Sequence, residues 1–140
     1  MPFMDIKPLI LEPIGIVVSE IKDAAAAPKQ GIEGAPSAWI VVDPRYAAAC
    51  QGLAIGDRLI VVTWLHVADR DLQLVHPRDE LAAPLKGVFA TRSADRPNPI
   101  GLHPVSLLAI DGIRFQVNPL EAIDGTPVLD IKPELSGAIF

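Results

Sequence analysis

The sequence predicts an all-β fold: a single-sheet antiparallel β-barrel with long loops and at most one short helix. Short runs rich in β-branched residues are separated by Pro and Gly, which is typical of all-β domains. The 140 residues include 14 Pro and 10 Gly, and both residue types mark the ends of strands. With many strands and almost no helix, we expect the sheet to close on itself and hide its edges.

Seven apolar runs are expected to form the strands. They lie at residues 14–18, 38–42, 59–67, 87–90, 105–110, 115–117 and 128–131. Asp111-Gly112, between two of these runs, is typical of a tight hairpin turn, and Asp124-Gly125 has the same form.

One short helix is expected at residues 46–50, after Pro44 and before Gly52. Residues 23–37 are rich in Ala, Gly and Pro and predict a long loop. Loops of more than about 12 residues in a compact domain are usually functional or mobile.

Length and composition favour one domain over residues 1–140. Half of the residues are apolar, and a chain of this size buries roughly 65–70% of its extended surface. No apolar run approaches the roughly 20 residues that cross a bilayer, and no signal-peptide pattern opens the chain. Cys50 is the only cysteine, which excludes an internal disulfide and fits a reducing compartment. We therefore expect a cytoplasmic protein that does not enter a membrane.

The net charge of −5 argues against a broad basic face for nucleic acid. An RNA partner would require a local positive patch or a second subunit. The chain has no glycine-rich dinucleotide fingerprint. His66, His76 and His103 are too dispersed for metal-ligand spacing, so no metal site is expected.

One stretch with unusual chemistry covers residues 87–102, Gly-Val-Phe-Ala-Thr-Arg-Ser-Ala-Asp-Arg-Pro-Asn-Pro-Ile-Gly-Leu. Pro97 and Pro99 restrict the backbone on both sides of the residue between them. The side chains that can donate from this stiff loop are those of Arg92, Ser93, Arg96 and Asn98. Such a set suits a ligand with a carboxylate, ribose hydroxyls or a base edge. Alternatively, the arginines pair with Asp95 and other surface acids.

A second polar stretch covers residues 124–133, Asp-Gly-Thr-Pro-Val-Leu-Asp-Ile-Lys-Pro. A turn leads into a short apolar strand, and alternation places Asp130 and Lys132 on one face of that strand. The alternative is a turn followed by an ordinary edge strand with an ion pair.

These two stretches together resemble the paired signatures of the TsaA-like (YaeB, TrmO) family. The similarity extends to residues 14–17, to Pro-Lys-Gln at 28–30, to Trp39 and to Leu65-His66, and so spans roughly residues 13–133. Known members are S-adenosylmethionine-dependent methyltransferases that modify N6-threonylcarbamoyladenosine beside the tRNA anticodon. Ala94 replaces the family's usual proline, and Glu134 replaces its usual tyrosine.

The resemblance implies a homodimeric β-barrel that binds S-adenosylmethionine without a Rossmann fold and acts on tRNA. The residues it assigns to the cofactor are Gln30, Gly31, His66, Arg92, Ser93, Arg96, His103, Pro104, Thr126, Pro127, Val128 and Leu129. Asn98 and Lys132 are expected to face the substrate. We hypothesise that Asp130 or His66 receives the proton released during methyl transfer.

Three other functions remain open at this stage. The protein could methylate another RNA or a small molecule, which the acidic charge and Glu134 favour. It could also bind the cofactor without catalysis, or be a structural barrel that binds nothing. Salt-dependent binding of tRNA would favour the RNA enzyme, because phosphate contacts release counterions.

Overall fold

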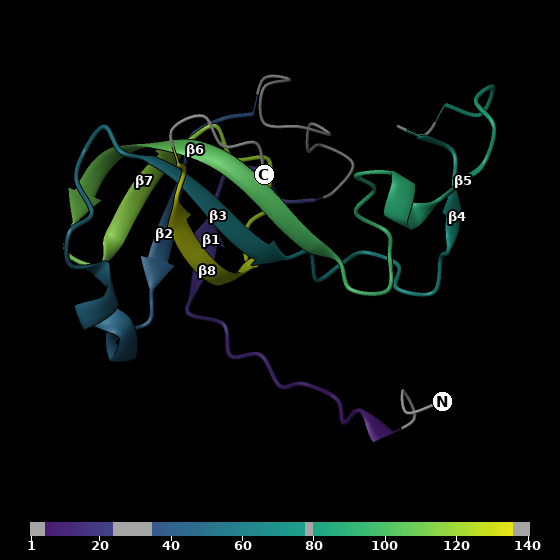
Figure 1. Cartoon of the computed structure of the whole chain (residues 1–140). Coiled ribbons are helices and arrows are strands. Elements are labelled where there is room, and N and C mark those ends of the chain that lie inside the picture. Colours follow the sequence, from purple (N-terminus) through teal and green to yellow (C-terminus); the bar gives the residue numbers. More distant parts are fainter. Residues whose placement is uncertain (1–4, 24–34, 78–79, 136–140) are drawn as a thin grey trace.

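The structure, a computed structural model, describes residues 5–23, 35–77 and 80–135. Six antiparallel strands pair in the order β1-β2-β7-β6-β3-β8, and β8 pairs back with β1, so the sheet closes into a ring (Figure 1). The strands of the ring are β1 (Gly15–Val18), β2 (Ala38–Val42), β3 (Arg58–Trp64), β6 (Ile100–Asp111), β7 (Arg114–Asn118) and β8 (Pro127–Pro133). The predicted antiparallel, mainly β architecture is therefore confirmed.

A second, two-stranded sheet lies beyond one end of the ring. It pairs β4 (Leu74–Val75) with β5 (Lys86–Gly87), and Figure 1 shows it apart from the six strands. The prediction of a single sheet is wrong in this respect, because the segment between β3 and β6 folds back on itself.

Both short helices of the described chain are of the 3₁₀ type. The first, η4 (Pro44–Cys50), covers the predicted helix, and the Asp43 carboxylate caps it by accepting the Arg45 N–H at 2.9 Å. Burial raises the pKa of the Cys50 thiol at its end. The second, η6 (Val88–Ala90), replaces most of the strand predicted at residues 87–90. The one short helix expected is η4, and η6 is a single 3₁₀ turn of three residues.

The predicted strands otherwise recur with shifted ends. The run at 59–67 ends at Trp64, and the run at 105–110 begins earlier, at Ile100. The predicted hairpin joins β6 to β7, with Asp111 opposite Arg114 and Gly112 at a φ of +63°. A positive φ is a conformation that glycine adopts at no steric cost.

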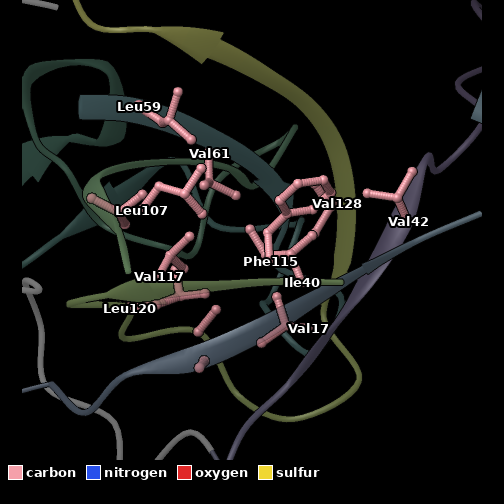
Figure 2. Packing of buried hydrophobic residues seen from close by; sticks show 13 residues of the cluster. Val17, Ile40, Val42, Leu59, Val61, Leu107, Phe115, Val117, Leu120 and Val128 are labelled. Atoms are coloured by element: carbon pink, nitrogen blue, oxygen red, sulfur yellow. The ribbon is translucent and has the colours of Figure 1, made fainter. Parts of the chain in front are cut away.

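Inward-pointing side chains fill the ring with an apolar core. Figure 2 shows Phe115 and Leu107 meeting the side chains of neighbouring strands there. From the start of β3 to its end, the side chains that point inward are Leu59, Val61 and Thr63. Strand β6 runs in the opposite direction, and its inward side chains, taken in the same spatial order, are Leu107, Val105 and His103. The buried face of this strand pair therefore changes from apolar to polar toward the end of β3.

No helix in the described ranges is both long and apolar enough to cross a membrane.

Candidate functional site at one end of the ring

Three connections between strands meet at one end of the ring. The first connects β1 to β2, the second connects β3 to β6, and the third connects β7 to β8. Neighbouring strands are antiparallel, so the C-terminal ends of β1, β3 and β7 lie beside the N-terminal ends of β2, β6 and β8. We call the described parts of these connections, residues 19–23, 35–37, 65–77, 80–99 and 119–126, the site end. The two stretches singled out in the sequence both begin there.

The signature loop, defined here as residues 91–99, is held by its own polar groups. The Thr91 hydroxyl accepts the Ser93 N–H at 3.2 Å, and the Ser93 hydroxyl accepts the Asp95 N–H at 3.2 Å. Arg96 Nη1 donates to the carbonyls of Thr91 and Ser93, each at 3.0 Å. Arg96 therefore links two parts of the loop to each other. The Asp95 carboxylate accepts the Asp69 N–H at 2.8 Å and so joins the loop to the turn after β3.

Arg70, which the sequence analysis did not single out, clamps the other half of this loop. Its Nε donates to the Pro97 carbonyl at 2.7 Å, and its Nη2 donates to Asn98 Oδ1 at 3.2 Å. The guanidinium also stacks 5.0 Å from the centre of the Trp64 ring. The two hydrogen bonds have no signature in residue spacing, because Pro97 and Asn98 lie 27 and 28 residues away along the chain.

A shallow hollow opens beside the signature loop. Phe89, Ala90, Thr91 and Arg92 line it. Phe89 is 84% exposed and the Arg92 side chain is also exposed, so an aromatic face and a cation border the same hollow. A flat ring and a carboxylate are the ligand groups that such neighbours suit.

A buried polar network lies directly behind the start of β6. His103 Nε2 lies 2.7 Å from the Thr63 hydroxyl, and His103 Nδ1 lies 2.5 Å from a Glu121 carboxylate oxygen. The His103 side chain is 3% exposed and that of Glu121 is 15% exposed. The imidazole therefore points into the ring, and the sequence analysis missed both of its partners.

The β7–β8 turn, residues 119–126, supplies Glu121 and leads into the second polar stretch. Asp124 accepts the Ser19 N–H at 2.9 Å and pairs with Lys22 Nζ at 3.2 Å. These two contacts hold the pKa of the Asp124 carboxyl below its ordinary value. Leu120 is fully buried in the core. The turn is thus anchored both by apolar packing and by charge.

Along β8 the side chains alternate between the core and the surface. Thr126, just before the strand, and Val128 are buried, whereas Pro127 and Leu129 are half-buried. The Thr126 hydroxyl donates to the Ile123 carbonyl at 2.7 Å.

Asp130 and Lys132 lie on one face of β8, as predicted. Their side chains form an ion pair at 3.0 Å. In register they stand opposite Val62 and Ile60 of β3.

The other predicted residues lie as follows. His66 is exposed in the turn after β3, where the Leu65 N–H donates to the Pro99 carbonyl at 2.8 Å and joins this turn to the signature loop. Pro104 is half-buried in β6. Gln30 and Gly31 fall outside the described residues. Glu134, at the family's tyrosine position, accepts from Arg58 Nε at 2.9 Å.

No cluster of His, Cys, Asp or Glu suited to a metal ion occurs within residues 5–23, 35–77 and 80–135.

Comparison with known proteins finds the same family along most of the chain. Residues 16–138 match the family model described as the tRNA-methyltransferase O N-terminal domain. A probable S-adenosyl-L-methionine-binding protein of Methanothermobacter thermautotrophicus is 41% identical over 123 residues, 88% of either chain. An S-adenosyl-L-methionine-binding protein of Archaeoglobus fulgidus is 40% identical over 124 residues, 89% of this chain and 88% of the relative.

Solved structures agree. A crystal structure of TrmO superposes with a TM-score of 0.75 at 30% identity, covering 94% of this chain. TrmO from Pseudomonas aeruginosa gives a TM-score of 0.72 at 28% identity, again over 94% of this chain. The chain spans 60% and 58% of the length of these two proteins. It belongs to the tRNA-methyltransferase O N-terminal domain family.

Proposed function

We propose that the protein, acting in the cytoplasm as one domain, binds S-adenosylmethionine at the site end of the ring and transfers its methyl group to tRNA. One observation carries the proposal: the fold brings the two family-matched stretches to one end of a closed ring. The names of the two relatives, both S-adenosyl-L-methionine-binding proteins, support the choice of cofactor. The closed ring supports the β-barrel implied by the resemblance.

The donor set at the hollow fits this cofactor. The Arg92 guanidinium suits the cofactor's carboxylate, and the Phe89 face suits its adenine. Ser93 and Arg96 keep the loop in shape through the hydrogen bonds they already make. His66, and Gln30 and Gly31 from the β1–β2 connection, would complete the cofactor pocket.

Buried residues in the predicted set would contribute through their backbone. The side chains of His103, Thr126 and Val128 point into the ring. Their carbonyls, with those of Pro104, Pro127 and Leu129, would therefore make the contacts, because a carbonyl that already accepts one hydrogen bond in the sheet keeps a second lone pair. A backbone held by a closed sheet offers donors and acceptors in fixed positions.

When bound, S-adenosylmethionine supplies an electrophilic methyl group next to a positive sulfonium. The residues of this chain need to orient the acceptor and exclude water. Asp130 is held in position by Lys132 and by the Ile131 N–H at 2.9 Å. In this proposal its carboxylate takes the proton from the acceptor nitrogen. His66 is the alternative proton acceptor.

We infer that the acceptor is N6-threonylcarbamoyladenosine beside the tRNA anticodon, with Asn98 and Lys132 facing it. Family membership supports tRNA. The segment between β3 and β6, residues 65–99, holds as many basic as acidic residues, so the net charge of −5 resides elsewhere. A polyanion would therefore meet little repulsion along this segment.

A homodimer would present two such sites. Ile100, Leu102, Leu108 and Ile110 on the outer face of β6 are 38–43% exposed, and such an apolar stripe supports self-association. Light scattering on the purified protein gives the oligomeric state directly.

A non-catalytic cofactor-binding role is the second candidate. The acidic net charge and the names of the relatives, which state binding alone, favour it.

Calorimetry with S-adenosylmethionine tests the proposal first. We expect a Kd of about a micromolar that Arg92→Ala abolishes and Arg45→Ala leaves unchanged, since Arg45 lies on η4 at the other end of the ring. Absence of binding to the wild type would refute the cofactor site. Methyl transfer to threonylcarbamoylated tRNA that is lost in Asp130→Asn with cofactor binding intact would establish the enzyme and identify Asp130 as its base. Full transfer by Asp130→Asn would leave His66 as the proton acceptor. Binding without transfer to any tRNA would favour the second candidate.

A further inference from the structure

We infer that Glu121, His103 and Thr63 form a positioning network that sets the β7–β8 turn against the start of β6 and thereby holds the cofactor-binding end of the ring in its active shape. The inference rests on the proposed function, since the affinity for S-adenosylmethionine is its readout. None of the three side chains is proposed to touch cofactor or substrate.

The network joins three segments that are distant in the sequence. Thr63 is the next-to-last residue of β3, three positions before His66. His103 is the fourth residue of β6, directly behind the signature loop. Glu121 lies in the turn that leads to Thr126 and β8. The network therefore joins a strand that runs into the site end, a strand that leaves it, and the β7–β8 turn.

Glu121 ties down the side of the turn that faces β6. On the β1 side the turn is fixed by its backbone, through the Asp124 N–H to the Ile21 carbonyl at 2.6 Å and the Gly125 N–H to the Val17 carbonyl at 2.8 Å. Toward β6 the contact is the Glu121 carboxylate on His103 at 2.5 Å. Leu120 and Ala122, on either side of Glu121, are buried in the core and fix the backbone that carries Glu121.

Hydrogen-bond chemistry fixes the orientation of the imidazole. An ionised carboxylate only accepts, so Nδ1 carries the proton shared with Glu121. In the neutral ring Nε2 then accepts the hydrogen of the Thr63 hydroxyl at 2.7 Å. Within the described residues, no buried side-chain polar atom lacks a partner, so the network is complete and costly to break.

The glycine of the Arg-Pro-Asn-Pro-Ile-Gly motif serves the same network. Gly101 stands opposite Thr63 in the β3–β6 register, and it lies where any side chain would collide with the Thr63–His103 pair. The motif therefore specifies both the stiff loop and the space that its neighbours His103 and Thr63 need.

The test compares affinity with stability in variants of the full chain. Thr63→Val removes the hydroxyl at nearly constant volume, and Glu121→Ala removes the carboxylate. Each is expected to raise the Kd for S-adenosylmethionine about tenfold or more, because displacement by about 1 Å is enough to impair a site. The conservative variants Thr63→Ser and Glu121→Gln keep the hydroxyl or the accepting oxygen and are expected to restore most of the affinity.

Val42→Ala is the control for a general loss of stability. Val42 is a core residue at the other end of the ring. We expect this variant to lower the melting temperature but keep the wild-type Kd. Amide exchange of residues 119–126 gives a second readout, faster in Glu121→Ala and unchanged in Glu121→Gln.

The possible outcomes separate the two proposals. If the wild type binds S-adenosylmethionine and Thr63→Val and Glu121→Ala bind it equally well, the positioning network is refuted and the proposed function stands. The positioning network is also refuted if Val42→Ala, at a similar loss of melting temperature, raises the Kd as much as Thr63→Val and Glu121→Ala do. If the wild type does not bind, the proposed function fails and the role in affinity fails with it. Amide exchange then shows separately whether Glu121 holds the turn.

Discussion

Gly101 and His103 are packed so closely that a Cβ on residue 101 would stand 2.6 Å from the imidazole Nε2. It would also stand 2.6 Å from the Thr63 hydroxyl oxygen. Gly101→Ala must therefore separate this hydrogen-bonded pair, at a cost of about 1–3 kcal/mol in the free energy of unfolding. Urea denaturation measures the loss.

Gly87→Ala is the matched control for Gly101→Ala. A Cβ there would have its nearest contact at 4.0 Å and the backbone φ is −60°. Its expected effect is within about 0.5 kcal/mol of zero. Equal stability of the two variants would contradict the tight packing described around Gly101.

Arg70 is expected to fix the signature loop through its contacts with Pro97, Asn98 and Trp64. Arg70→Gln should cost only about 1 kcal/mol of stability, because the side chain is exposed. Amide exchange in residues 91–99 should nevertheless become faster, and the Kd for S-adenosylmethionine should rise. Tryptophan fluorescence should change as Trp64 loses the stacked cation.

Arg114→Gln provides the control for this prediction. Arg114 also stacks 5.0 Å from a tryptophan, Trp39, but on β7 and β2. The Arg114→Gln variant should change the tryptophan fluorescence without affecting the signature loop. Unchanged exchange in residues 91–99 of Arg70→Gln would show that the loop is stiff without the clamp.

The fold was largely predictable because strand signals are local. Residues 38–42 alternate between buried and half-buried in β2 as β-branched runs do. The beginning of β6 was missed because Pro99, Gly101 and Pro104 all weaken a strand pattern. In the structure Pro104 stands opposite Ile60, and tertiary pairing with β3 overrides the local propensity.

The site was only partly predictable, for a related reason. The Arg92–Asn98 stretch could be recognised by its composition, and the shared face of Asp130 and Lys132 followed from alternation. The partners of His103 could not be found, because Thr63 and Glu121 are 40 and 18 residues away along the chain. Only the closed ring brings them together.

Leu120 tests whether the β7–β8 turn is part of the core. Its side chain is fully buried among the ring residues, so Leu120→Ala should cost about 2–5 kcal/mol of stability. Leu81→Ala, at a leucine that is 82% exposed, should cost less than about 0.5 kcal/mol. Similar urea midpoints for the two variants would mean that the turn is not packed as described.

Asp124 should make stability depend on pH in the acid range. Its carboxylate is stabilised by the Ser19 N–H and by Lys22, which lower its pKa in the folded protein below the ordinary value of 3.8. A group whose folded pKa is lowered stabilises the fold above its unfolded pKa and loses that contribution as pH falls through the folded pKa. The free energy of unfolding of the wild type should therefore exceed that of Asp124→Asn most at neutral pH, and the difference should shrink below about pH 4.

Asp111→Asn, at an exposed carboxylate on the β6–β7 hairpin, controls for the change in net charge. A wild-type advantage over Asp124→Asn that stays constant from neutral pH down to about pH 2 would show that the amide perturbs packing instead, and that the charge of Asp124 does not anchor the turn.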